Sequence, residues 1–128
     1  MNRLSPYGAV LVRLAVGGVL LHHGLAKVHD GLPVLREFLR GAGVWFPAIG
    51  AVVVLVVETV GALCLILGVF TRFWAACAAV EMIVAIVAVK LPAHRNIDLE
   101  AVLLAGAAAL VLWGEGPFSL GIGLKRRD

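Results

Sequence analysis

Residues 47–68, PAIGAVVVLVVETVGALCLILG, form an apolar run with a single charged side chain, Glu58. A helix of about 20 residues is long enough to cross the hydrocarbon core of a bilayer, so this run predicts a transmembrane helix. At about 1.5 Å of rise per residue, Glu58 lies ~16 Å from Pro47 and is expected near the middle of that helix. A carboxylate at such a depth is costly, and it therefore indicates either a functional site or a polar contact between helices.

The rest of the chain repeats this pattern. Of its 128 residues, 62% are hydrophobic and 15% are charged, whereas soluble proteins carry roughly 25% charged residues. Four apolar runs have lengths that suit a membrane crossing; they cover residues 7–27, 46–67, 73–89 and 97–113. We therefore expect an all-α fold, with one integral membrane domain over residues 1–128 built as a four-helix transmembrane bundle.

A short amphipathic helix is expected between the first two spans. In residues 32–40, LPVLREFLR, three leucines fall at helical spacing, and the charged side chains lie off that stripe. Pro33 suits a first helical turn. Such a segment favours the plane of the membrane interface.

Both ends of the chain are consistent with a protein held in a lipid bilayer. Arg13 interrupts the first apolar run, and that run is longer than the core of a signal peptide, so we expect an uncleaved span. The net charge is +3, and the basic tail 125–127 is expected to meet anionic lipid headgroups and not nucleic acid. Basic residues divide equally between the two sides, so the charge rule leaves the orientation open. An even number of spans places both termini on one side.

A second carboxyl group is expected at the depth of Glu58. Glu81 lies nine residues from both Arg72 and Lys90, or about 13.5 Å from each end of its span. Arg13, in the first span, is expected to extend its long side chain toward this pair. One guanidinium between two carboxyl groups leaves an unmatched acid, which favours a function over simple packing.

Further polar residues extend this group toward the side opposite the termini. His23 and Lys27 lie near the end of the first span, and Glu100, near the start of the fourth, is expected to bond one of them. The candidate ligand or proton-path residues are Arg13, His23, Lys27, Glu58, Glu81 and Glu100. The alternative interpretation is that these charges only hold the helices in register. No metal site is expected, because the histidines lack metal-binding spacing.

The sequence contains no nucleotide-binding loop and no serine-centred triad, and Cys64 and Cys77 do not form a C-x-x-C redox pair. No residue is therefore assigned a catalytic role. Small residues at every fourth position, Ala101, Ala105 and Ala109, predict a helix-packing seam in the fourth span.

Several motifs resemble those of the DoxX family of small four-helix membrane proteins. HGLAK (23–27) is similar to its HG-x-x-K element, and ETVGALCLILGVFTR (58–72) to its run of glutamate, glycine and G-x-x-TR. EMIVAI (81–86) resembles an E-M-x-x-A stretch, and GEGPFSLG (114–121) resembles a terminal G-P-G-x-x-S-L-D element. The resemblance covers nearly the whole chain in order.

Arg13 and Glu100 also stand where this family places an arginine in the first span and a glutamate at the start of the fourth. Two positions depart from the pattern, since Glu115 replaces a proline and Gly121 replaces the closing aspartate. The resemblance implies a bacterial or archaeal inner-membrane protein with cytoplasmic termini. It also implies association with redox systems, as a membrane subunit beside a thiosulfate:quinone oxidoreductase, a quinol oxidase or thiol- and superoxide-detoxifying proteins. A likeness of fold does not by itself establish an activity.

These observations lead to three hypotheses about function. The first is a non-catalytic membrane subunit of an oxidoreductase complex, which anchors a redox partner protein and binds a quinone or similar small molecule among the buried polar residues. The second is a carrier or exporter that moves a small solute or protons along the same residues. The third is a membrane scaffold whose charges fix helix register. A quinone is the candidate cofactor, and self-association into a homo-oligomer stays open.

Overall fold

The computed structural model describes residues 5–114, and every regular element in that range is a helix. The all-α prediction is therefore confirmed. The helices, in chain order, are α1 (Ser5–Asp30), α2 (Leu32–Gly41), α3 (Pro47–Val56), η1 (Val57–Gly61), α4 (Ala62–Leu67), α5 (Thr71–Val84), η2 (Ala85–Lys90) and α6 (Asp98–Trp113). The predicted basic tail, and the terminal motif from residue 115 onward, lie outside the described residues.

Within residues 5–114, three stretches of helix are long and apolar enough to cross a membrane: Tyr7–Asp30, Pro47–Leu67 and Thr71–Lys90. The second of these is the continuous rod formed by α3, η1 and α4, and the third is formed by α5 and η2. α6 has 16 residues and is about 24 Å long, which is less than the roughly 30 Å of a hydrocarbon core. It is short because acidic residues occupy its first turn and because the chain leaves the helix at Gly114, whose φ is +81°.

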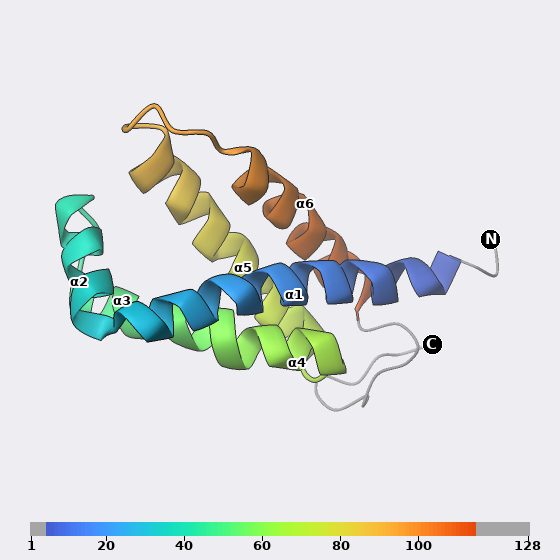
Figure 1. The fold of residues 1–128 in the computed structure, drawn as a ribbon. Coiled ribbons are helices and arrows are strands. Elements are labelled where there is room, and N and C mark those ends of the chain that lie inside the picture. Colours follow the sequence, from blue (N-terminus) through green and yellow to red (C-terminus); the bar gives the residue numbers. More distant parts are fainter. Residues whose placement is uncertain (1–4, 115–128) are drawn as a thin grey trace.

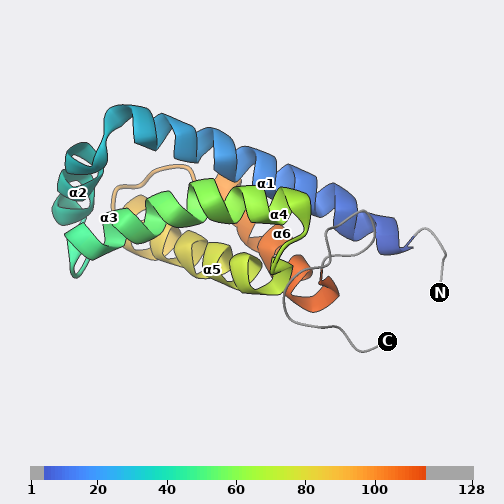
Figure 2. The ribbon, with the colours of Figure 1, turned by 90° about the horizontal axis from the view of Figure 1, so that it is seen from below.

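The helices are arranged as two pairs. α1 lies along α3, η1 and α4, and α5 lies along α6 (Figures 1 and 2). At the end of the molecule away from Ser5 and Gly114, the α5–α6 pair diverges from α1 and α3 (Figure 1). α2 stands across that same end, beside α3 and the last turns of α1 (Figures 1 and 2).

Small side chains make up much of the core between the helices. Ala62, Ala75 and Ala107 are completely buried, and the larger Leu65 and Leu110 fill the space around them. In a membrane, helices associate through close packing and not through the hydrophobic effect, and small residues allow the backbones to approach. The core therefore lies where α1, α4, α5 and α6 meet.

The seam predicted for the fourth span is wrong. Ala101 and Ala105 are exposed, and α6 instead packs through Leu103, Ala107 and Leu110, which are buried. Counting alanines identified a stripe of small side chains on α6, but not the face that contacts its neighbours.

A change of helix type occurs around Glu58. Residues Val57–Gly61 form a π-helical turn, η1, inside the second rod. The Thr59 hydroxyl donates a hydrogen bond to the Leu55 carbonyl oxygen at 2.6 Å, within this stretch. The Trp74 ring lies against Gly61, where a Cβ would be only 2.5 Å from the ring. Turns of this kind are rare and often occur at functional sites.

The predicted amphipathic helix at residues 32–40 is present as α2. Leu35 and Leu39 are buried and pack with Ala51 of α3, so this part of its apolar stripe faces the protein. Gly31 and Gly43, at the two ends of α2, have φ angles of +96° and +81°. These left-handed conformations favour glycine and let the chain turn sharply into and out of α2.

Candidate functional site

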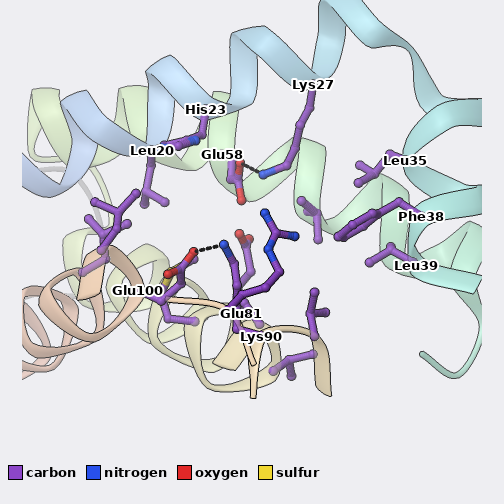
Figure 3. Close-up of a pocket in the computed structure, with 18 of the residues that line it drawn as sticks. Leu20, His23, Lys27, Leu35, Phe38, Leu39, Glu58, Glu81, Lys90 and Glu100 are labelled. Carbon is purple, nitrogen blue, oxygen red and sulfur yellow. Dashed lines mark hydrogen bonds and ion pairs between the residues drawn. The ribbon is translucent and has the colours of Figure 1, made fainter. Parts of the chain in front are cut away.

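A cavity of about 680 Å³ lies at the end of the molecule where the helix pairs diverge. Its wall is formed by α1, α2, α3, η1, α5, η2, α6 and the connection before α6, and most of it is apolar (Figure 3). A volume of about 300–1,000 Å³ is typical of small-molecule sites. The polar residues that line it are His23, Lys27, Glu58, Glu81, Lys90, Arg95, Asn96, Asp98 and Glu100.

The centre of the site is an ion pair between the first two rods. Lys27 Nζ of α1 lies 2.5 Å from Glu58 Oε1 of η1 (Figure 3). The Glu58 side chain is only 3% exposed, whereas that of Lys27 is 32% exposed. The buried Glu58 carboxylate therefore has Lys27 as its charge partner. The Lys27 side chain also lines the cavity and is partly accessible.

Gly24 makes this pair possible. A Cβ at Gly24 would lie 2.3 Å from the Glu58 carbonyl oxygen and 2.9 Å from the Thr59 Cγ2 atom. α1 and η1 therefore touch backbone to backbone at this level. Lys27, about one turn further along α1, is brought level with the Glu58 carboxylate.

Glu81 supplies a second carboxyl group to the same cavity. It projects from α5 and lies close enough to interact with both Glu58 and Lys27 (Figure 3). Its Oε1 atom is buried and has no hydrogen-bond partner among the described residues. One ammonium group thus faces two carboxyl groups, and Glu81 has an open position for a proton or for a hydrogen-bond donor on a ligand.

A second ion pair joins η2 to α6 in the wall of the cavity. Lys90 Nζ lies 3.2 Å from Glu100 Oε2, and both side chains are largely buried (Figure 3). The expectation that Glu100 bonds His23 or Lys27 is therefore wrong. Lys90 and Glu100 face each other because η2 and α6 are consecutive antiparallel segments joined by the short connection 91–97.

Arg13 does not belong to the cavity. It is buried, at 1% exposure, and makes contacts of its own. Its position is fourteen residues before Lys27, or about 21 Å along α1. Lys27, and not Arg13, is the cation opposite the two glutamates. The other five candidate residues, His23, Lys27, Glu58, Glu81 and Glu100, all line the cavity.

Several lining residues were not singled out from the sequence. Leu35, Phe38 and Leu39 of α2 form one side of the cavity (Figure 3). Arg95, in the connection before α6, and Asp98, the first residue of α6, line the rim of the cavity. A signal was present for the leucines, because the apolar stripe of the short helix needs a surface to cover.

Both π-helical segments border the cavity. η1 carries Glu58, and η2 contributes Ala85, Val89 and Lys90. π-helical turns are rare and often occur at functional sites, so the presence of two beside one cavity favours a functional role for the cavity. Within residues 5–114, no cluster of three or more His, Cys, Asp or Glu side chains is placed to hold a metal ion. Cys64 and Cys77 are free thiols.

Membrane-length apolar helices around a cavity with ion-paired walls define a helical membrane protein with charged side chains inside its bundle. The profile of the DoxX family matches residues 8–91, about two-thirds of the chain, and the protein belongs to the DoxX family. The matched segment includes Lys27, Glu58, Glu81 and Lys90. Comparison with curated proteins gives no match, and neither does comparison with solved structures.

Proposed function

We propose that this protein is the membrane subunit of a redox complex and that its cavity binds a quinone. The observation that carries the proposal is the cavity itself, in which the Lys27–Glu58 pair and the Glu81 carboxyl group meet apolar walls. A quinone has a flat apolar body with two polar oxygens, so it matches a mainly apolar site with few polar groups.

The polar groups suit both oxidation states of such a ligand. A quinone carbonyl oxygen can accept a hydrogen bond from Lys27 Nζ, which is partly accessible. A quinol hydroxyl can donate to Glu81 Oε1, which has no partner among the described residues. Reduction of a quinone to a quinol takes up two electrons and two protons. In this proposal a partner protein exchanges the electrons, and the carboxyl groups and His23 carry the protons.

The proposed topology places the protein in the inner membrane with four crossings and both termini in the cytoplasm. α6 would be the fourth crossing. Because it is short, the bilayer around it would become locally thinner. α2 would lie at the opposite interface, where the exposed Leu32 and Val34 can meet lipid. The cavity then lies toward the non-cytoplasmic side, because α2 and the connection before α6 form part of its wall.

Ligand titration tests the proposal. The purified protein, in lipid nanodiscs, is titrated with a soluble quinone analogue and binding is followed by fluorescence quenching of its tryptophans. Lys27→Met should weaken binding of the quinone analogue, and Glu81→Gln should weaken binding of its reduced quinol form, each by about tenfold, the loss expected for one hydrogen bond to a charged group. Glu37→Gln is the matched control, because Glu37 is 60% exposed and does not line the cavity.

Two results would count against the proposal. If the ligand affinity is unchanged in both cavity variants, these residues do not form the binding site. Flux of a solute or of protons through vesicles that contain this protein alone would favour a carrier instead.

A further inference from the structure

Three cationic side chains line the cavity, and two of them already form ion pairs with acidic residues. Lys27 is paired with Glu58, and Lys90 is paired with Glu100. The third, Arg95, lies in the connection between η2 and α6 and is exposed. Its guanidinium makes no ion pair or hydrogen bond with any residue in the described part of the chain. The rim of the cavity therefore carries one cation with all its donors available.

Backbone hydrogen bonds hold Arg95 at this rim. The Arg95 amide donates to the Lys90 carbonyl oxygen at 2.9 Å, and the His94 amide donates to the Leu91 carbonyl oxygen at 3.1 Å. On the other side, the Asp98 amide donates to Asn96 Oδ1 at 2.7 Å. His94 itself has a φ of +54°, in the left-handed region. The connection is thus a set of tight turns that keeps the Arg95 backbone next to the Lys90–Glu100 pair.

We propose that Arg95 binds an oxyanion on the ligand of this cavity, so that the ligand is an apolar molecule with a single negative charge. The inference rests on the proposed function in that it uses the same cavity. A guanidinium offers five donors in a planar fork, binds carboxylate or phosphate oxygens in a bidentate manner, and can also donate to the single oxygen of a phenolate. The apolar body would lie against Leu35, Phe38 and Val89 on the inner wall.

The other charges at the rim limit the ligand to one negative charge. Asp98 lines the cavity three residues after Arg95, and Glu100 is compensated by Lys90. In total, three cationic and four acidic side chains line the cavity. Because acids outnumber cations in this lining, and Arg95 is the one cation of the described lining outside an ion pair, a second negative charge on the ligand would have no cation to offset it.

Two sources could supply this chemistry: an acidic quinone, or the phosphate of a phospholipid whose chains enter the cavity. For the first, the probes are 2-hydroxy-1,4-naphthoquinone, which is ionised at neutral pH, and 2-methyl-1,4-naphthoquinone, which is uncharged. Both are titrated into the full-length protein in phosphatidylcholine nanodiscs. The wild-type protein should bind the ionised compound about tenfold more tightly.

Three variants assign that preference to a residue. Arg95→Gln should abolish it, and Arg95→Lys should keep part of it, because an ammonium retains the charge but not the fork. Arg36→Gln should behave as wild type, because Arg36 is also exposed but does not line this cavity. Both glutamine variants remove one exposed cation, so overall charge cannot explain a difference between them.

Native mass spectrometry tests the lipid source. Protein extracted from bilayers of phosphatidylglycerol and phosphatidylcholine should retain phosphatidylglycerol, and Arg95→Gln should lose it while Arg36→Gln retains it. An effect of Arg95 on either probe supports the inference and identifies the source of the oxyanion. If Arg95→Gln changes neither the naphthoquinone preference nor lipid retention, the inference is overturned. Failure of the quinone proposal gives a different result, since neither naphthoquinone would then bind any variant.

Discussion

Gly24 and Glu58 are in backbone contact, and a Cβ at Gly24 would lie 2.3 Å from the Glu58 carbonyl oxygen. Gly24→Ala should therefore push α1 away from η1 and disturb the Lys27–Glu58 pair. Overpacking of this kind costs about 1–3 kcal/mol in well-packed cores, and we expect the upper part of that range because the clash is with backbone atoms. The measurement is the thermal transition of the protein in detergent micelles, followed by helical circular dichroism.

Gly18→Ala is the control for this substitution. Gly18 is also in α1, and a Cβ there would meet nothing within 4 Å. The same change should stabilise the helix by about 0.5–1 kcal/mol, since alanine is the better helix former. If both variants shift the transition in the same direction, the close packing at Gly24 does not limit stability.

The two partners of the central ion pair should respond unequally to substitution. Lys27→Met leaves the Glu58 carboxylate, 3% exposed, without its charge partner, and should cost about 3 kcal/mol. Glu58→Gln leaves Lys27, whose side chain is 32% exposed and can be hydrated, so it should cost less. The double variant Lys27→Met/Glu58→Met should recover much of the loss, because it leaves no charge unpaired. Thermal transitions of the three proteins, measured together, would contradict this account if the two single variants were equal.

The second pair, Lys90–Glu100, should contribute less than the first. Its side chains are 21% and 13% exposed, so neither charge is as deeply buried as the Glu58 carboxylate, which is 3% exposed. Glu100→Gln should cost about 1 kcal/mol, and the exchange Lys90→Glu/Glu100→Lys should restore most of it. Glu37→Gln serves as the reference, because the Arg40–Glu37 pair is about 60% exposed on both sides and should show no measurable effect. A loss in Glu100→Gln equal to that in the reference variant would argue that η2 and α6 are held together by packing alone.

The positions of the helices could be predicted from the sequence because hydropathy is a local property. The run at 46–67 is a rod over Pro47–Leu67, and the run at 73–89 lies within Thr71–Lys90. The short helix at 32–40 could be recognised in the same way, from three leucines at helical spacing. Each of these features depends only on residues that are neighbours in the chain.

The register between helices could not be predicted in this way, and the choice of cation depended on it. Counting from Tyr7 places Arg13 nearest to Glu58, but that count assumes that the rods begin at the same level. α1 runs on to Asp30, and its contact with η1 is set by Gly24. No property of hydropathy marks this glycine as the contact point. The π-helical turn at Glu58 likewise reflects tertiary packing, with Trp74 lying on Gly61.

The number of membrane crossings can be tested by cysteine labelling. The background is a variant in which Cys64 and Cys77, both free thiols, are replaced by alanine. Single cysteines are then introduced at four turns or helix ends and treated in intact cells with a membrane-impermeant maleimide. Asp30→Cys lies at the last residue of α1, and Asn96→Cys lies in the connection before α6. In the proposed topology both face the periplasm, so both should react without permeabilisation.

The other two cysteines decide whether α6 crosses. Phe70→Cys lies between α4 and α5, and Trp113→Cys lies at the end of α6. Both original side chains are exposed, at 43% and 40%, so neither position is hidden by packing. Four crossings require that both react only after permeabilisation. Reaction of Trp113→Cys in intact cells, with Phe70→Cys still protected, would mean three crossings. α6, about 24 Å long, would then return to the side of the membrane from which it starts.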